Sequence, residues 1–195
     1  MIKVAVLLMF TGLLLSAQSP MPKALMEGNP ASSVRVLIYE DLQCPDCADF
    51  RKMLDTQLLP KYKGTVAFEH RDFPLLKHAW ARQAAIASRY FETVSPELAV
   101  DFRKATMAAQ SKILPENFYT HLADFAATHK VDPAAAVMAL ENPALQARVE
   151  ADYQEGVARG IARTPTVLVN GHPFIETFSA AAIIKAIDQE LKAAK

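Results

Sequence analysis

Two cysteines are, by type and spacing, the residues of this sequence best suited to chemistry. Cys44 and Cys47 stand in the stretch Cys44-Pro45-Asp46-Cys47, and they are the only cysteines among the 195 residues. An apolar, β-branched segment precedes the pair and a helical pattern follows it. The first turn of a helix has unpaired N–H groups and carries partial positive charge. A thiolate at Cys44 is therefore stabilised, with a pKa below the usual value of about 8.5.

The pattern also predicts a division of roles between the two sulfur atoms. Cys47 shares an apolar helix face with Phe50 and Leu54, which indicates a buried side chain. Cys44 is then the sulfur that attacks as a thiolate, and Cys47 resolves the mixed disulfide. Pro45 suits the first helical position, because its missing N–H would have had no partner there.

Three other interpretations of the pair remain open from the residues alone. A structural disulfide across so small a loop would stabilise the fold by only about 2 kcal/mol, against about 4.7 kcal/mol for a 100-residue loop. A closed zinc site needs four ligands, whereas there is no second Cys-X-X-Cys and the five histidines are scattered along the chain. An incidental pair is the third interpretation, and the predicted export of a chain with only these two cysteines disfavours it.

The first residues have the pattern of a secretory signal. Lys3 precedes an apolar run that ends at Leu15, and the small residues Ser16 and Ala17 follow. The run is shorter than the roughly 20 residues that a membrane span needs. We expect a signal peptide over residues 1–17 with an uncertain cleavage site. The product is then periplasmic or otherwise exported, and soluble after cleavage.

Composition excludes several classes of protein. Lysine and arginine number 21, aspartate and glutamate also number 21, and 51% of the residues are hydrophobic. The balance of charge gives no basic field for nucleic acid, so no nucleic-acid partner is expected. The apolar content excludes a disordered chain, and two cysteines exclude a disulfide-dense scaffold.

The elements that must position the cysteines follow a strand–helix–strand order. Residues 34–39 are almost continuously apolar, which is typical of a strand covered on both faces. A helix is predicted over 45–58, ended by Pro60 and Gly64, and a second strand over 65–70. Such a unit has a right-handed crossover. Residues 18–33, rich in proline, are expected to be an extended lead-in.

The middle of the chain is rich in alanine and leucine and has no strand-like run. Ser95, Asp132 and Asn142 each precede a proline, which is the pattern of a helix cap followed by the first helical residue. Leu114-Pro115 is a fourth such start. The expected helices cover 78–92, 96–111, 115–129, 133–141 and 143–159, and Gly160 closes the last one. Trp80 is expected to pack between these helices and the rest of the fold.

The C-terminal part returns to strands. Residues 166–169 form an expected strand, Asn170-Gly171 is a hairpin turn signal, and 173–176 can pair back. A final helix is expected over residues 180–191, capped by Ser179. The overall order is βαβ, helices, ββα.

At this point the chain resembles the thioredoxin fold and, within it, the DsbA-like thiol oxidoreductases. The resemblance covers residues 34–191. It rests on the long helical insertion and on three stretches, which are EDLQCPDC at 40–47, RDFPL at 71–75 and GIARTPT at 160–166 followed by Asn170-Gly171. It implies an α/β protein with a mixed central sheet. Residues 34–77 and 160–195 would form the thioredoxin-like domain, and residues 78–159 an all-helical insertion.

The resemblance also implies a mechanism. Pro165 would be a cis proline that exposes the backbone of Thr164 beside Cys44, where an extended substrate peptide could pair with it. The function implied is an exported dithiol–disulfide oxidoreductase that oxidises protein thiols. It would need no cofactor besides the Cys44–Cys47 disulfide, and a membrane partner would re-oxidise it.

The sequence departs from the pattern of DsbA-type oxidases at two positions. Asp46 stands where a histidine is usual before the second cysteine, and a carboxylate there should raise the pKa of Cys44 and make the couple less oxidising. Ile38 occupies the position of the buried acid of thioredoxins, so proton transfer to or from Cys47 would use water or another acid, for which Glu40 and Asp41 are the candidates. The rival functions are a reductase or isomerase of the same fold, a Cu(I) carrier using both thiolates, and a structural or interaction module with an inert disulfide.

Overall fold

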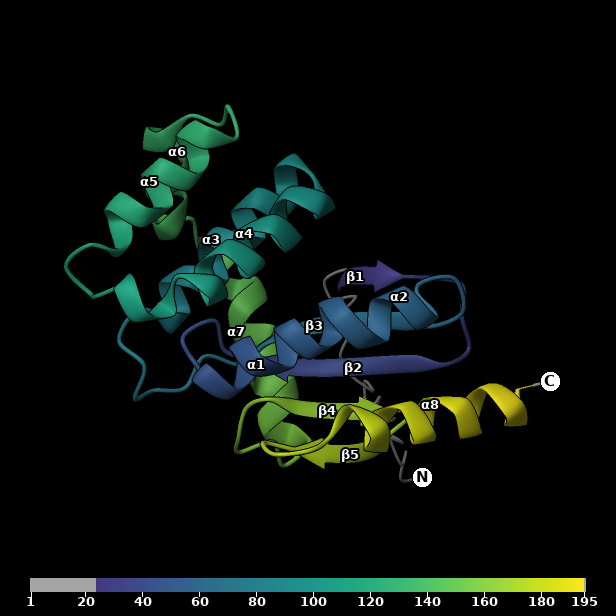
Figure 1. The fold of residues 1–195 in the computed structure, drawn as a ribbon. Helices are drawn as coiled ribbons and strands as arrows, with labels where there is room; N and C mark the ends of the chain where they lie inside the picture. Colours follow the sequence, from purple (N-terminus) through teal and green to yellow (C-terminus); the bar gives the residue numbers. More distant parts are fainter. Residues whose placement is uncertain (1–23, 195) are drawn as a thin grey trace, which may run out of the picture.

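A five-stranded mixed sheet forms the centre of the protein (Figure 1). The computed structural model of the chain describes residues 24–194. The strand order is β1-β3-β2-β4-β5; β2 and β3 run parallel and the other neighbours antiparallel. The mixed sheet of the predicted thioredoxin fold is thereby confirmed. The strands are β1 Leu25–Gly28, β2 Arg35–Glu40, β3 Ala67–Asp72, β4 Thr166–Val169 and β5 His172–Ile175.

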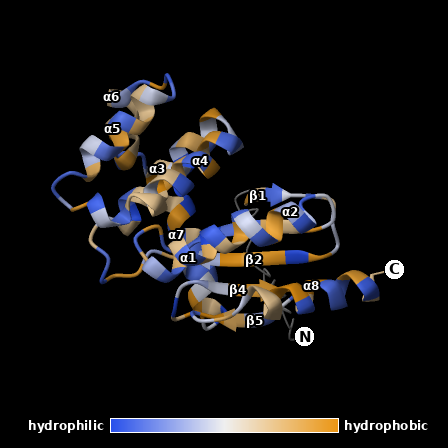
Figure 2. Cartoon of the chain, viewed as in Figure 1, coloured by the Kyte–Doolittle hydropathy of each residue, from blue (hydrophilic) through white to orange (hydrophobic). Residues whose placement is uncertain are grey.

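Helices cover both faces of the sheet, which explains the apolar run in β2. Helices α1 (Pro45–Met53), α2 (Leu59–Tyr62) and α8 (Ala180–Ala193) lie on one side and α7 (Pro143–Ala158) on the other (Figure 1). Figure 2 shows that β2 is hydrophobic over most of its length. One apolar core joins the sheet to α1 and α8 through Val36, Ile38, Phe50, Leu54, Val167, Ile183 and Ile187. Burial on both faces of β2 holds the strand that leads directly into the cysteine loop.

The helix after the cysteines continues past the proline that was predicted to end it. A π-helical turn, η1 (Leu54–Leu58), joins α1 to α2, and α2 contains Pro60. In this turn the Leu59 N–H donates to the Leu54 carbonyl, one residue farther back than in an α-helix. The wider turn accommodates a residue that has no N–H and whose ring crowds the preceding turn. The prediction that Pro60 ends the helix is therefore wrong.

Three of the helices in the insertion begin at the capping residues that the sequence predicts. The side chains of Ser95, Asp132 and Asn142 accept hydrogen bonds from backbone N–H groups of the first turns of α4, α6 and α7. The start at Pro115 is wrong, because Leu114 and Asn117 close a turn and α5 begins at Phe118. The elements are α3 Ala81–Val94, α4 Pro96–Ala108, η2 Gln110–Lys112, α5 Phe118–Thr128, α6 Pro133–Met138 and η3 Ala139–Glu141.

Glycine supplies the conformations that end α7 and turn the C-terminal hairpin. Gly160 has φ of +76°, and the Ile161 N–H donates to the Gly156 carbonyl at 2.9 Å. This geometry terminates the helix and starts the loop that leads to Pro165. Asn170 and Gly171 both have positive φ between β4 and β5, as the turn signal predicts.

The extended lead-in contributes a strand that the sequence pattern did not show. Residues Leu25–Gly28 form β1 at the sheet edge, antiparallel to β3. A four-residue segment carries too little periodicity to be recognised, and its partner lies some forty positions away. The predicted signal peptide and residues 18–23 lie outside the described residues. Within residues 24–194, no helix combines the length and apolarity needed to cross a bilayer.

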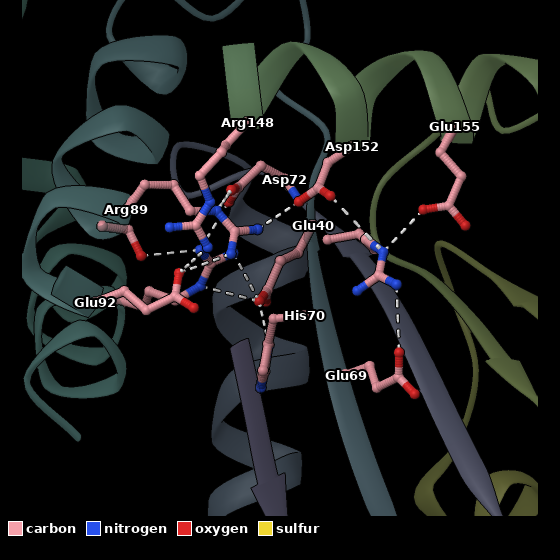
Figure 3. Close-up of polar contacts among 12 residues, drawn as sticks. Glu40, Glu69, His70, Asp72, Arg89, Glu92, Arg148, Asp152 and Glu155 are labelled. Atoms are coloured by element: carbon pink, nitrogen blue, oxygen red, sulfur yellow. Dashed lines mark hydrogen bonds and ion pairs between the residues drawn. The ribbon is translucent and has the colours of Figure 1, made fainter. Parts of the chain in front are cut away.

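A buried ionic cluster joins the insertion to the carboxyl ends of β2 and β3 (Figure 3). Arg103 of α4 donates to Glu40 at 3.0 Å and to Asp72 at 2.7 Å. Arg89 of α3 donates to Asp72 at 2.5 Å and also pairs with Asp152 of α7. These side chains are almost completely buried. Removing one member of such a cluster leaves a buried charge without compensation, so the cluster fixes the insertion on the strand ends.

The substitution Arg103→Met should therefore destabilise the fold strongly. It removes the cation shared by Glu40 and Asp72, and such losses cost about 3–5 kcal/mol. The measurement is urea unfolding followed by circular dichroism. Arg82→Met is the matched control, because Arg82 pairs with Glu150 at the surface with half of its side chain exposed, and its loss should cost less than about 1 kcal/mol. Equal destabilisation by both substitutions would contradict the role given to the cluster.

Candidate active site

Cys44 lies at the N-terminal end of α1, as the sequence predicts. It is the N-cap residue with extended backbone angles, and Pro45 follows as the first helical residue. The Cys44 N–H donates to the Asp41 carbonyl at 3.0 Å, and the Cys47 N–H to the Cys44 carbonyl at 3.1 Å. These bonds hold the loop between β2 and α1 in a fixed turn. Both cysteines are free thiols, and Cys44 is 6% exposed.

The surroundings of Cys44 lower its pKa to about 6. The largest cause is the hydrogen bond from the Cys47 thiol, and the Thr164 side chain and the Cys47 backbone N–H add to it. Burial and the Asp41 carboxylate act in the opposite direction. This direction agrees with the predicted stabilisation of a Cys44 thiolate, although the partner thiol contributes more than the Cys47 backbone N–H.

Cys47 has the opposite environment. Its side chain is completely buried, and burial raises its pKa well above the usual range. The Asp41 N–H points at the Cys47 sulfur at 3.4 Å. The predicted burial of Cys47 is therefore observed, and the two sulfurs differ in the direction of their pKa shifts.

The loop before β4 completes the site from a distant part of the chain. The Thr164–Pro165 peptide bond is cis, as the resemblance implies. The Cys44 thiol donates to the Thr164 carbonyl at 3.3 Å. The Thr164 hydroxyl is buried without a hydrogen bond of normal geometry, so its proton is available to a thiolate at Cys44. The structure thus brings Thr164 and Pro165 together with Cys44.

Asp46 is an exposed residue that lines the same cavity as Cys44. Pro45 and Asp46 are both exposed on the first turn of α1, where water screens the charge of Asp46. The carboxylate that opposes ionisation of Cys44 is that of Asp41. Acidic charge thus opposes ionisation of Cys44, and that charge includes Asp41; the effect expected of Asp46 stays a prediction.

Cys44 opens into a cavity of about 420 Å³ with a partly apolar lining. Phe73, Tyr153 and Ile161 line it together with Leu76, whose side chain is 95% exposed. Thr164 forms part of the same wall. A chain segment that enters this cavity therefore reaches the sulfur and the backbone before Pro165 at the same time.

Three contacts around the cysteine loop were not found from the sequence. His78 contacts the Asp41 carboxylate at 2.7 Å. Gln110 donates to the Cys44 carbonyl at 3.0 Å, and the Gln43 side chain accepts from the Trp80 N–H at 2.8 Å. Gln110 belongs to the helical insertion, and no sequence signal marks it. His78 follows directly after the RDFPL stretch, which was the available signal. Trp80 is buried and stacks on Phe118, in agreement with its predicted packing role.

Glu40 and Asp41, the two candidate acids near the cysteines, differ in the groups that hold their carboxylates. Glu40 is fully buried, and although burial opposes ionisation, Arg103 and His70 lower its pKa to about 2. It belongs to the ionic cluster (Figure 3). Asp41 instead accepts hydrogen bonds from the Gln43 and Leu75 N–H groups and contacts His78. Among the residues that the structure describes, no group of three or more histidines, cysteines or acids is arranged to hold a metal ion.

A family model described as thioredoxin matches residues 21–189. The chain belongs to the thioredoxin family. A comparison with curated proteins finds no match. Within the described part of this thioredoxin-family protein, the order of strands and helices around Cys44, Cys47 and Pro165 agrees with that assignment.

Solved structures show the same fold as this family member. BdbD from Bacillus subtilis, in its oxidised form, superposes with a TM-score of 0.78 at 24% identity, covering 87% of this chain and 93% of that one. Wolbachia pipientis α-DsbA1 gives 0.77 at 20% identity, covering 90% and 94%. Chlamydia trachomatis DsbA gives 0.73 at 16% identity, covering 88% and 93%. The coverage includes the helical insertion, so the predicted DsbA-like fold is confirmed.

The rate at which Cys44 is alkylated should increase with pH as its thiol ionises. Because its pKa is lowered to about 6, the thiolate fraction rises as pH increases through 6 and is nearly complete at neutral pH. The rate of alkylation by iodoacetamide should therefore be half-maximal near pH 6. Peptide mapping should place the label on Cys44, with Cys47 unlabelled in the folded protein. A midpoint at or above the usual thiol value of about 8.5 would contradict the stabilisation.

Proposed function

We propose that this protein is an exported dithiol–disulfide oxidoreductase that oxidises thiols of protein substrates through Cys44 and Cys47. The observation that carries the proposal is that two sulfurs with different environments lie at the same helix end. One is ionisable and opens into a cavity beside Thr164 and Pro165. The other is buried directly behind it.

The exchange proceeds by two successive attacks at sulfur. A substrate thiolate attacks Cys44 in the Cys44–Cys47 disulfide, a substrate–Cys44 bond forms, and the electron pair remains on Cys47, which takes up a proton. A second substrate thiolate then attacks the first substrate sulfur and displaces Cys44 as a thiolate. The substrate leaves with a disulfide, and the protein retains the two electrons as a dithiol.

The lowered pKa of Cys44 favours the oxidising direction. A stabilised thiolate stabilises the reduced protein and so makes its disulfide a stronger oxidant. The value of about 6 lies between about 3.5 for a DsbA and about 7 for thioredoxin. We therefore expect an oxidant that is weaker than a DsbA of that kind.

The site suits extended peptide segments as substrates. The backbone at Thr164 lies beside the cavity that contains Cys44, and strand-like pairing there supplies affinity with little dependence on sequence. A similar protein, α-DsbA2 from Wolbachia pipientis, is described as a thiol-disulfide exchange protein. Export through the N-terminal segment and re-oxidation by a membrane partner complete the proposal, and the Cys44–Cys47 disulfide serves as the only redox group.

Serine variants test which sulfur starts the exchange. In an assay of insulin reduction with dithiothreitol, Cys44→Ser should lose activity to the uncatalysed rate, because no thiolate is left at the helix end. Cys47→Ser should retain the first attack and accumulate a mixed disulfide at Cys44, detectable by mass spectrometry. Activity of Cys44→Ser equal to that of the unmodified protein would remove Cys44 from the mechanism.

The reduction potential tests the direction of exchange. Equilibration with glutathione buffers should give a value closer to about −120 mV, typical of a strong oxidant, than to about −270 mV, typical of a reductant. The readout is the ratio of dithiol to disulfide after alkylation. A value near −270 mV would replace the oxidase by the reductase while leaving the exchange chemistry intact.

A further inference from the structure

The buried thiol of Cys47 needs a route by which its proton can leave and return. In the proposed function, Cys47 is a leaving group in one half of the cycle and an attacking group in the other. Its side chain is completely buried, and burial disfavours its thiolate. The position from which thioredoxins supply a buried acid is Ile38, which is itself buried and apolar. The route must therefore use water or another side chain.

Glu40 is held in a way that prevents it from serving as that group. Its Oε1 atom contacts His70 Nδ1 at 2.5 Å and accepts from Arg103 at 3.0 Å. Its side chain is 2% exposed and lies inside the cluster that fixes the insertion (Figure 3). A carboxylate held between cations, with its pKa lowered to about 2, remains ionised throughout the cycle.

Asp41 lies next to the cysteines and is connected differently. Its N–H points at the Cys47 sulfur at 3.4 Å, and its carboxylate influences the ionisation of Cys44. The carboxylate is completely buried and accepts from the Leu75 N–H at 2.8 Å. Asp41 thus reaches Cys47 through its backbone N–H and Cys44 through the charge of its carboxylate, and backbone N–H groups, not fixed cations, hold that carboxylate.

His78 links this acid to the surface. Its Nδ1 atom lies 2.7 Å from Oδ2 of Asp41, and 15% of its side chain is exposed whereas the carboxylate has no exposure. The His78 N–H donates to the Leu75 carbonyl at 3.0 Å, so the loop that holds the carboxylate also holds the imidazole. An imidazole can exchange a proton with water at one nitrogen and with a carboxylate at the other.

We propose that Asp41 is the acid–base group for Cys47 and that His78 is its positioning residue and its link to solvent. When a substrate thiolate breaks the Cys44–Cys47 bond, the Cys47 thiolate that is released takes a proton from the Asp41–His78 pair. Asp41 and His78 then regain a proton from water through His78. In re-oxidation, the Cys47 thiol returns its proton to Asp41 and His78. Its thiolate then attacks the mixed disulfide at Cys44, and the electron pair leaves on the partner's sulfur.

Several other titratable groups face the Asp41–His78 pair or the neighbouring cavity of Cys44. Cys44, Cys47 and Glu40 are the titratable groups closest to the pair along β2 and α1. The cavity of Cys44 is also lined by the titratable side chains of Asp46, Lys77, Tyr153, Arg163 and Glu176. The insertion faces the same loop with the uncharged side chain of Gln110.

The test separates the two attacks, because only the second requires Cys47 to lose its proton. Reduced protein is mixed with glutathione disulfide, quenched with acid at short times and analysed by mass spectrometry. The first step is formation of the Cys44–glutathione disulfide, and the second is its resolution by Cys47. The variants are Asp41→Asn and His78→Gln. Asp49→Asn, at an exposed acid of α1, and His129→Gln, at the exposed C-cap of α5, are the matched controls.

Asp41→Asn should slow the second step at neutral pH by at least about tenfold, which is a modest loss for an acid–base group. The pH profile of that step should move toward higher pH, a change that a loss of structure alone would not cause. The first step should persist, with its midpoint at lower pH because the opposing charge near Cys44 is gone. His78→Gln should slow the second step by a smaller factor and move its profile in the same direction.

Unchanged second-step rates and pH profiles in both variants would overturn the inference while leaving the proposed exchange intact. A wild-type protein that forms no mixed disulfide, or never resolves it, would overturn both. If Asp41→Asn does not fold, His78→Gln decides alone, because it leaves the carboxylate and its backbone contacts in place. A profile of His78→Gln identical to that of His129→Gln would then refute the link to solvent.

Discussion

The site depends on holding one sulfur as an anion in a place almost closed to water. Burial opposes a thiolate, and at Cys44 this opposition is overcome by the thiol and N–H of Cys47 and by the Thr164 side chain. All three donors must converge on one atom that is still open to a cavity. At Cys47 the same burial outweighs the one hydrogen bond from the Asp41 N–H, so the pKa of Cys47 is raised. The difference between the two sulfurs is thus a consequence of where the donors lie.

This convergence requires that separate segments be fixed relative to one another. The loop before β4 is set by the end of α7 at Gly160, and the cysteine loop by the end of β2. Arg89 and Arg103 bring the insertion onto the strand ends through the acids of the ionic cluster. Gln110 then reaches from the insertion to the carbonyl of Cys44. The insertion therefore supports the cysteine loop as well as covering the molecule.

Acidic side chains near the cysteines are distinguished by their partners and not by their distance along the chain. Glu40 and Asp41 are neighbours, yet one is bound to fixed cations and the other to backbone N–H groups and a partly exposed imidazole. Successive residues at the end of a strand point to opposite sides. One acid consequently enters the structural cluster and the other enters the active-site loop.

The sequence by itself determined the cysteine motif, the helix that begins there and most of the capped helices of the insertion. These features depend on local rules: Pro45 at a first helical position, Ser95 and Asn142 as caps, and Asn170-Gly171 as a turn. It also indicated which sulfur would be buried, because Cys47 falls on an apolar helix face.

Only the tertiary structure decided the pairing of Asp41 with His78, the contact of Gln110 with the cysteine loop and the addition of β1 to the sheet. It also assigned an opposing charge to Asp41 and placed Asp46 in solvent. Each of these depends on contacts between residues far apart in the chain, or on whether a side chain faces water. Hydrophobic periodicity and capping residues carry no information about such contacts, because they report only what a segment prefers along its own length.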